Sequence, residues 1–521
     1  MVKFLKTNLF FFLLLTAVVF SLYGKSINFD FTYRDDSVLI LEKANFLSDI
    51  RNVPKLFTTS CFYSNDFQYY RPILNFVLLT ETVFFGTNSK VYHSTNIILF
   101  ILALYLMYVF LCKLKLNETI LKSIVLLMSV HPILTSCVVW IPARNDTLLA
   151  IFIILSFIFF VKYLENNLTK NLSLYVLFFT LALFTKETAI LTLLLYPLFV
   201  YCFNYKINKK EIIKNVCIFI TILLIYFILR GVAVSDNNIT QYLINIVPFL
   251  KNMFAGICMY LYELFIPDNF PIMLYDIKLN VFNIAILVCS IIFIIIILNK
   301  KIIAKKIMIF FVSWFVLFLL PTFLLLQDYV FFNHRIIVSV LSSIFIFAII
   351  AEYLIGKNPI LKKCLIVLFV LLFGINSYFC FVQQNKYKNR QEYWTNTYSE
   401  VPTYHGACYW LGRLSLEQGK FRTAKDLFIK ANNLKPVYLC DLALIYYYEG
   451  NYNKSEELYN KSIESGINKA QSYRNLSTIY LKRDKDKPKA IEYAKLAVQE
   501  EPYDDRYKEY LKKLTDEKDN L

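Results

Sequence analysis

Apolar runs long enough to cross a lipid bilayer recur along the first 382 residues of the chain. A helix of about 20 apolar residues spans the hydrocarbon core of a membrane, so each run is a candidate crossing. The pattern predicts an all-α fold: a polytopic membrane domain of about 11 transmembrane helices. The runs lie near 7–23, 92–112, 119–140, 147–164, 172–185, 188–204, 212–231, 280–299, 307–326, 335–355 and 361–382.

Composition and charge divide the chain into two parts. Overall, 57% of the residues are hydrophobic and 18% are charged, against about 45–50% and about 25% in soluble globular proteins. An ordinary cytosolic enzyme is therefore excluded. The 93 charged residues divide into 49 in residues 1–382 and 44 in the 139 residues that follow. We predict a membrane domain over 1–382, a linker over 383–402 and a soluble domain over 403–521.

The first apolar run resembles a signal peptide, since Lys3 and Lys6 precede it. No small-x-small cleavage site follows at residues 21–24, which favours an uncleaved membrane anchor. Short loops rich in Lys and Arg mark the cytoplasmic face. If the N-terminus is cytoplasmic and the ambiguous run 247–266 does not cross the membrane, all of these loops lie on the cytoplasmic face. The C-terminus is then extracytoplasmic. If 247–266 crosses, the Lys300–Lys306 cluster lies outside.

The opposite face collects the loops that carry ionisable residues. The longest loop, 24–91, contains Asp35 and Asp36. Charges at membrane depth are costly, so they usually form pairs or line a functional cavity. Because several loops bring ionisable residues to this one face, the residues together favour a functional site. The pairs Arg144–Asp146 and Lys186–Glu187 have an alternative explanation as ion pairs that anchor helix ends. The other members of the set are Arg71, His93, His131 and Arg335.

The residue types on this face suit transfer from a lipid-linked phosphate. Adjacent carboxylates provide a general base or bind a metal, whereas Arg and Lys recognise phosphate. The sequence has no Gly-rich phosphate loop, no zinc-type His/Cys cluster and no Ser nucleophile elbow. No cofactor is predicted with certainty, and a divalent cation held by Asp36 stays an alternative. Nucleic acid is not expected as a partner.

The C-terminal part contains an internal repeat. Small and large residues recur at the positions that pack the paired helices of a tetratricopeptide repeat. Three copies are expected at about 405–435, 436–469 and 470–503, followed by a terminal helix over 503–515. Such stacks bind peptides or partner proteins. The first copy is marked by Leu411, Gly412, Ala424, Phe428, Ala431 and Pro436, and the third has one extra residue around Asp484–Pro488.

Short motifs recur in one order along the chain. They are Asp35-Asp36, residues 70–74, residues 92–96, His131-Pro132 through Trp140 to Arg144-Asn145-Asp146, residues 184–188 and His334-Arg335. Together with the C-terminal repeats they resemble the transmembrane-and-tetratricopeptide O-mannosyltransferase-like proteins, which are similar to the wider GT-C class of polytopic glycosyltransferases. The resemblance extends over effectively the full length. Departures from the pattern occur at Arg34, Asn145 and Ile336, and the repeats are few.

The resemblance implies an inverting transfer of a sugar, such as the hexose mannose, from a polyprenyl-phosphate or dolichyl-phosphate donor. In that class an acidic residue of the first outer loop is the catalytic base, which falls here on Asp35 or Asp36. Arg335, Lys186 and His131 are then expected to bind the donor phosphate. Supporting positions fall on Arg144, Asp146, Glu187, Arg71 and His93, the last two equally suited to ordering the loop.

Two other classes of function stay open at this point. A non-catalytic membrane scaffold that displays the repeats is one alternative, and a transporter is another, although mid-helix acidic residues are scarce. The acceptor is expected to be a protein or glycan held by the repeats, with membrane lipid as surroundings. The many Ile, Lys, Asn, Phe and Tyr residues are typical of an AT-rich genome and favour a bacterial inner membrane over an endoplasmic reticulum.

Overall fold

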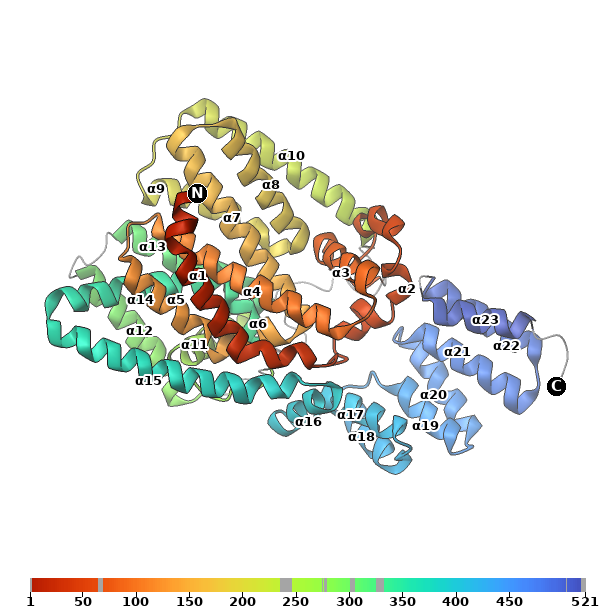
Figure 1. Cartoon of the computed structure of the whole chain (residues 1–521). Helices are drawn as coiled ribbons and strands as arrows, with labels where there is room; N and C mark the ends of the chain where they lie inside the picture. Colours follow the sequence, from red (N-terminus) through yellow and green to blue (C-terminus); the bar gives the residue numbers. More distant parts are fainter. Residues whose placement is uncertain are drawn as a thin grey trace. The chain divides into compact units, whose positions relative to one another are not determined.

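The computed structural model describes residues 2–63, 69–234, 246–273, 275, 279–299, 305–324, 332–502 and 504–516. Throughout these residues the chain is helical, with no strand, as the sequence predicts. The chain forms two compact units, coloured along the sequence in Figure 1. Unit 1 comprises Met1–Asp36 and Ile50–Asn389, and unit 2 comprises Ser37–Asp49 and Arg390–Leu521.

Within the described residues, unit 1 has eight helical segments long and apolar enough to cross a membrane. A ninth is added if the bent pair Glu118–Ser129 and Pro132–Val139 counts as one broken span. The eight are Asn8–Asn28, Ser89–Cys112, Ile141–Asn166, Lys209–Ala233, Val281–Asn299, Lys305–Phe323, Asn333–Lys357 and Ile360–Tyr387.

The difference from the eleven predicted crossings has local causes. The run 119–140 is bent by 61° at its break, where Pro132 has no N–H with which to continue the helix. The runs 172–185 and 188–204 form apolar helices shorter than a span, α8 (Thr169–Thr185) and η6–α9 (Glu187–Cys202). The ambiguous run 247–266 forms α11 (Ile246–Phe265), which is not among the candidate spans.

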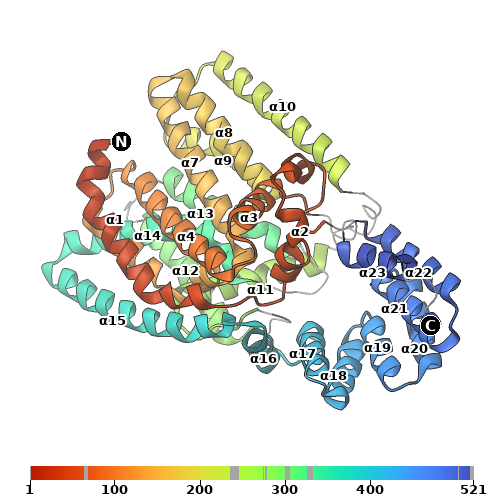
Figure 2. The same cartoon turned by 45° about the vertical axis from the view of Figure 1, so that its right-hand side comes forward.

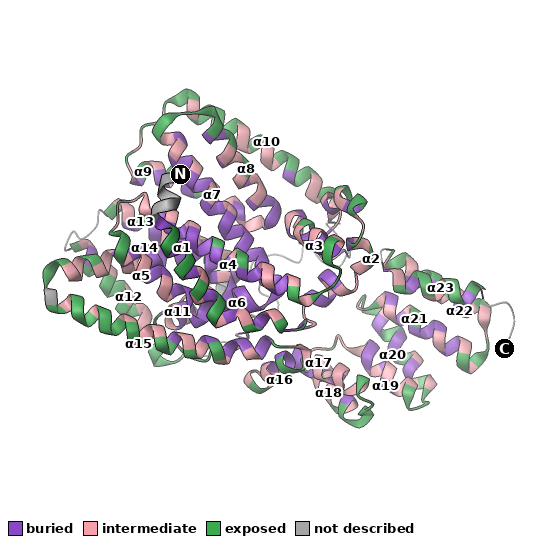
Figure 3. Ribbon diagram, in the orientation of Figure 1, coloured by how far each residue is buried: buried purple, intermediate pink, exposed green. Residues whose placement is uncertain are grey.

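The core of unit 1 is built around α4 (Ser89–Cys112) and α7 (Arg144–Asn166), which pack on each other and are mostly buried. Figure 2 shows α8 beside α7. By contrast, α10 (Lys209–Ala233), α12 (Val281–Asn299) and α15 (Pro359–Gln384) are mostly exposed in Figure 3. Their exposed side chains are large and apolar. A surface of this kind suits lipid, because soluble proteins rarely expose apolar patches so large.

The remaining elements of unit 1 connect and flank this core. These remaining elements are α1 (Val2–Tyr23), η1 (Gly24–Asn28), η3 (Ile50–Phe57), α3 (Pro72–Phe85), α5 (Glu118–Ser129), η4 (Pro132–Leu134), α6 (Thr135–Val139), η5 (Ile141–Ala143), α13 (Lys305–Leu324), η8 (Asn333–Ile336), α14 (Ile337–Lys357) and η9 (Asn385–Tyr387). Along the chain, η3 and α3 follow the acidic pair, Asp35 and Asp36, and η8 precedes α14.

Unit 2 is a stack of helix pairs: α17 packs on α18, α19 on α20 and α21 on α22, with α23 against α22. Gly412 allows the first pair to approach closely, because a Cβ atom there would lie 2.7 Å from the Phe428 ring. The helices are α16 (Arg390–Glu400), α17 (His405–Glu417), α18 (Phe421–Leu434), α19 (Leu439–Tyr448), α20 (Tyr452–Glu464), α21 (Lys469–Ile479), α22 (Lys487–Glu500) and α23 (Asp505–Asp516).

The turns inside the pairs explain the extra residue of the third copy. Gly419 and Gly450 close the first two turns with φ of 72° and 78°, a left-handed conformation that glycine adopts without steric cost. In the third pair the π-helical turn η10 (Tyr480–Asp484) precedes Lys485, whose φ is 52°. The longer turn thus lies where the sequence places the insertion.

Two segments join unit 2 that the sequence does not mark as part of a repeat. The first is α16, which lies within the predicted linker 383–402 and whose Trp394 stacks on Trp410 at 5.5 Å. The end of α15 and η9, which lie in the same predicted linker, belong to unit 1. The segment Ser37–Asp49, which follows the acidic pair, also belongs to unit 2. There Glu42 accepts a hydrogen bond from Arg506 at 3.2 Å. It contains the short elements η2 (Ser37–Leu41) and α2 (Ala44–Leu47).

Replacing Ala424 or Ala431 by Asp is expected to unfold the repeat stack. Both side chains are fully buried between helices, and a charge placed there has no partner or water to compensate its burial. We expect a loss of about 3 kcal/mol or more, in the range of other uncompensated buried charges. Limited proteolysis of the full chain measures it, with Thr423→Asp on the exposed side of α18 as the control that should stay resistant.

Candidate functional site

Asp35 and Asp36 follow a bend in which Tyr33 has a φ of 58°, a conformation that costs energy for a residue with a bulky side chain. Asp36 is 1% exposed. Its Oδ2 atom accepts hydrogen bonds from the backbone N–H of Thr32 at 2.7 Å and the Thr32 hydroxyl at 3.0 Å. Its Oδ1 atom has no hydrogen-bond partner among the described residues. Asp35 is half-buried beside it.

Burial raises the pKa values of both carboxyl groups. The pKa of Asp36 rises from 3.8 to about 6, mainly by desolvation, although the hydrogen bonds from Thr32 oppose the rise. Desolvation also raises the pKa of Asp35, against the opposing charges of Arg34, Arg71 and Arg335. Asp35 therefore lies close enough to these cations to feel their charges. A carboxylate with a raised pKa is a stronger base, which suits proton abstraction near neutral pH.

Replacing Asp36 by Asn is expected to stabilise the protein at neutral pH. A folded-state pKa above the unfolded value favours folding at low pH and opposes it as pH rises through the window from 3.8 to about 6. The amide carries no charge, so the gain in melting temperature over the wild type should be largest near pH 7.5 and vanish below the unfolded-state pKa of 3.8. Asp268→Asn, at an exposed position, should show no such pH-dependent gain. An equal gain at both pH values would contradict the buried-carboxylate account.

Arg335 lies on η8, immediately before α14. Its guanidinium lies over the Phe332 ring at 5.4 Å, and its Nη1 atom has no hydrogen-bond partner among the described residues. The guanidinium of Arg34 lies over the same ring at 4.9 Å, and Trp140 stacks on it at 5.7 Å. Trp140 also donates a hydrogen bond to the Thr32 hydroxyl at 3.2 Å. These aromatic contacts connect the loop of the acidic pair with η8.

Asp146 and Lys186 form an ion pair between α7 and the end of α8. Lys186 Nζ lies 2.6 Å from Asp146 Oδ1, and His334 Nε2 lies 3.7 Å from Asp146 Oδ2. The Lys186 and Asp146 side chains are 12% and 6% exposed. The alternative explanation of Lys186 and Glu187 as an ion pair does not apply, because Glu187 pairs with Arg71. Because its charge is compensated by Asp146, Lys186 is less available to an incoming phosphate than Arg335.

Arg71 belongs to a second ion pair. It precedes Pro72, the first residue of α3, a position where proline's missing N–H costs nothing. Its Nη2 and Nε atoms donate to Glu187 at 3.3 Å and 3.5 Å. When the Asn145 amide is oriented so that its nitrogen donates a hydrogen bond to the Thr185 carbonyl, its oxygen accepts a hydrogen bond from Arg71 Nη1 at 3.0 Å. This network ties α3, α7 and η6 together beside the acidic pair.

Arg144 is fully buried and is bonded on every side. Its Nε donates to Asn96 at 2.9 Å, its Nη2 donates to the Tyr92 carbonyl at 2.8 Å, and its Nη1 pairs with Glu81. The alternative explanation of Arg144 and Asp146 as an ion pair does not apply, because the two side chains have different partners, Glu81 and Lys186. Glu81, on α3, was not among the sequence candidates. An isolated acidic residue within an apolar helix was the available signal.

The two histidines of the set are both buried. His131 Nδ1 accepts from the backbone N–H of Ile133 at 3.3 Å. Its Nε2 lies 3.1 Å from the Leu264 carbonyl and donates to it. Neither nitrogen is then available for a phosphate. His93 is 1% exposed and packs edge-on against Phe29 at 6.2 Å.

The chain brings the sequence candidates of loops 24–91, 184–188 and 332–336 together in unit 1. The charges of Arg71 and Arg335 act on the Asp35 carboxyl group, and Asp146 joins Lys186 to His334. Arg144 and His131 are hydrogen-bonded to other parts of the chain, and His93 packs against Phe29. In the described residues, no three His, Cys, Asp or Glu side chains gather as a metal site would require.

Comparisons with known proteins identify the repeats of unit 2. A tetratricopeptide repeat family model matches residues 405–438 and 436–465, which confirms the first two predicted copies. A search of curated proteins and a search of solved structures found no match to the chain. The sequence and the fold therefore describe a protein with membrane-compatible helices and a C-terminal tetratricopeptide repeat region.

Proposed function

We propose that the chain is an integral-membrane glycosyltransferase that moves a sugar, such as a hexose, from a polyprenyl-phosphate donor to an acceptor hydroxyl. The observation that carries this proposal is the acidic pair beside Arg335. Asp36 Oδ1 and Arg335 Nη1 both lack hydrogen-bond partners among the described residues, although burying unpaired polar atoms is costly. A base and an unpaired cation in one site match an acceptor hydroxyl and a leaving phosphate.

The reaction is a single displacement. The Asp35 carboxylate takes the proton of the acceptor hydroxyl, whose oxygen forms a bond to the anomeric carbon. The bond between that carbon and the lipid phosphate oxygen breaks, and the phosphate leaves from the opposite face with the electron pair. A base on the side opposite the leaving group gives inversion. Asp36 orients the acceptor through its unpaired Oδ1 atom.

Arg335 stabilises the charge that develops on the leaving phosphate, as oriented cations do for other anions. The charges of Lys186 and Arg71 are compensated by Asp146 and Glu187, and these ion pairs position the elements around Arg335. The motif resemblance to the GT-C class adds independent support for a lipid-phosphate donor. The N-terminus is cytoplasmic and the site extracytoplasmic in this proposal, with the repeats presenting an acceptor protein or glycan.

Replacing Arg335 by Ala is expected to weaken binding of polyprenyl phosphate by about 10-fold or more, the worth of a hydrogen bond between charged groups. Binding of a fluorescent polyprenyl phosphate to the purified protein measures the effect. Lys90→Gln, an exposed residue at the start of α4, is the matched control and should bind as the wild type does. Unchanged binding in the Arg335 variant would remove Arg335 from the donor site.

A scaffold that displays the repeats is the second candidate function. The repeat match favours it, because tetratricopeptide stacks commonly bind other proteins. It differs from the enzyme in one respect: neutral replacement of Asp35 and Asp36 leaves a scaffold's function intact, whereas substitution in the concave face of the repeats removes it.

A further inference from the structure

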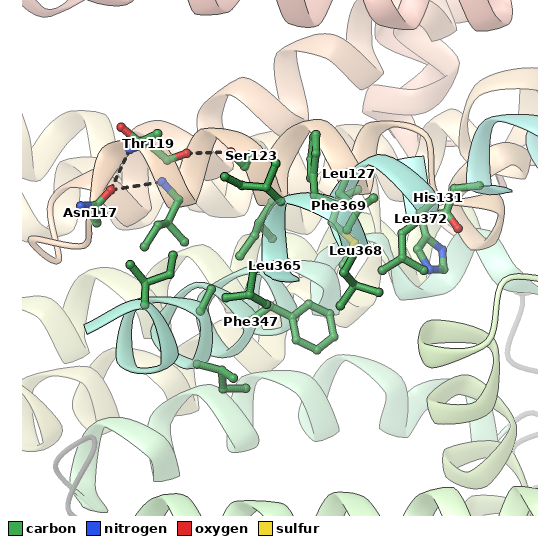
Figure 4. A pocket seen from close by; sticks show the side chains of 18 of the residues that line it. Asn117, Thr119, Ser123, Leu127, His131, Phe347, Leu365, Leu368, Phe369 and Leu372 are labelled. Atoms are coloured by element: carbon green, nitrogen blue, oxygen red, sulfur yellow. Dashed lines mark hydrogen bonds between the residues drawn. The ribbon is translucent and has the colours of Figure 1, made fainter. Parts of the chain in front are cut away.

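An apolar groove lies within unit 1 between α5, α14 and α15, with the end of α11 at one margin. Its volume is about 720 Å³. Figure 4 shows Ser123 and Leu127 on one wall and Leu365, Leu368 and Phe369 on the other. The acidic pair, Arg335 and Lys186 are not among the residues that line it. The groove is therefore separate from the proposed transfer site.

The groove has the length of an extended hydrocarbon chain. It is lined from Asn117 and Thr119 at one end to His131 at the other, as Figure 4 shows. On α15 it runs from Lys362 to Asn376, about 20 Å at 1.5 Å per residue. The hydrocarbon core of a bilayer is about 30 Å thick. The groove follows the axes of helices long enough to cross that core, so it lies along the path of lipid chains.

The two ends differ in charge. Lys362 is exposed, and of the lining residues it alone carries a permanent charge. The Asn117 side chain beside that end is occupied in capping α5, through the backbone N–H groups of Thr119 and Ile120. Two carboxylates lie nearby: Glu352 accepts from the Asn117 backbone N–H at 3.4 Å, and Glu118 pairs with Lys122 at 3.3 Å.

The opposite end offers no such attraction. Both His131 nitrogens are engaged by the chain itself, and the Asn376 amide is neutral. An anionic headgroup is therefore favoured only at the Lys362 end. Basic groups beside grooves between transmembrane helices are a known means of binding anionic lipid headgroups.

We propose that this groove binds one hydrocarbon chain of an anionic phospholipid, whose headgroup contacts Lys362. The occupant comes from the leaflet on the Lys362 side, which the Lys/Arg bias predicts to be cytoplasmic. The site is distinct from the sugar donor's phosphate site at Arg335 and does not depend on the proposed function. It makes the packing of α15 on α5 and α14 dependent on the lipid composition of the membrane.

The test compares melting temperatures of the full chain in neutral detergent with added phosphatidylglycerol, phosphatidylcholine or polyprenyl phosphate. Phosphatidylglycerol should stabilise the wild type at lower concentrations than phosphatidylcholine does. Lys362→Gln should weaken the phosphatidylglycerol effect about 5-fold, the value of one basic group near an anionic headgroup. Lys363→Gln, an exposed neighbour that does not line the groove, is the control and should retain most of the effect.

A second variant tests the groove itself. Ala351→Phe places a ring among the lining residues and should abolish stabilisation by both phospholipids, which Lys362→Gln alone should not. Equal effects of the two phospholipids on the wild type would overturn the assignment of an anionic headgroup. Stabilisation by polyprenyl phosphate alone, lost in Ala351→Phe and kept in Lys362→Gln, would assign the groove to the donor lipid instead and contradict the proposal.

Discussion

If the chain is the proposed glycosyltransferase, Asp35→Asn is expected to lower the turnover of sugar transfer by about 10²- to 10⁴-fold, the usual contribution of general acid–base catalysis. The amide keeps the size and most of the hydrogen bonding of the carboxylate but cannot accept the acceptor's proton. Donor affinity should barely change, since the donor phosphate is assigned to Arg335. Pre-steady-state transfer measured beside equilibrium binding of the donor separates the two quantities.

Asp36→Asn decides between the two members of the pair. If Asp35 is the base, the Asp36 variant loses acceptor orientation, and its transfer rate falls less than that of the Asp35 variant. If the transfer rate falls more in Asp36→Asn than in Asp35→Asn, Asp36 is the base and Asp35 orients the acceptor. Near-normal transfer in both variants would mean that the carboxylates are structural, and the catalytic assignment would fail.

Arg144→Met is the substitution with the largest expected cost in stability. The side chain is 0% exposed and pairs with Glu81, whose own side chain is 9% exposed. Removing one partner of a buried ion pair leaves an uncompensated charge, at a cost of about 3–5 kcal/mol. The thermal midpoint of the purified protein should fall accordingly.

The partner variant identifies the cause. Glu81→Leu combined with Arg144→Met removes both charges, so the double variant should be more stable than Arg144→Met alone. Lys122→Met, which removes a cation from an exposed pair with Glu118, is the control and should cost less than about 1 kcal/mol. If the double variant is no more stable than the single one, the loss comes from packing and not from the charge on Glu81.

The fold followed from the sequence where the pattern is long and periodic. Apolar runs predicted each of the eight spans, because hydrophobicity alone determines which helices suit a membrane. The repeats were equally readable from their small residues, such as Gly412 against Phe428. The apolar runs 172–185 and 188–204 correspond to helices shorter than the candidate spans, because a hydropathy pattern does not show where a helix ends.

The site was predicted less completely. The charges of Arg71 and Arg335 act on the Asp35 carboxyl group, but the ion-pair partners did not follow from sequence adjacency. Lys186 pairs with Asp146, 40 residues away, and Arg144 pairs with Glu81, 63 residues away. Neighbouring residues on a helix point in different directions, so only the packing of α3, α7 and α8 decides these pairs. The sequence of Ser37–Asp49 likewise contains no pattern that would predict that this segment belongs to unit 2.

Release of polyprenyl phosphate from a panel of polyprenyl-phosphate sugars, followed with the purified full chain and an acceptor, tests the central claim most directly. The account predicts release from at least one donor, matched by sugar on the acceptor with inverted anomeric configuration, and reduced by about 10²-fold or more in Asp35→Asn. A chelator added in parallel shows whether a divalent cation takes part. Binding of the donors without any release, or release that Asp35→Asn and Asp36→Asn leave unchanged, would contradict the assignment of this chain as a glycosyltransferase with an aspartate base.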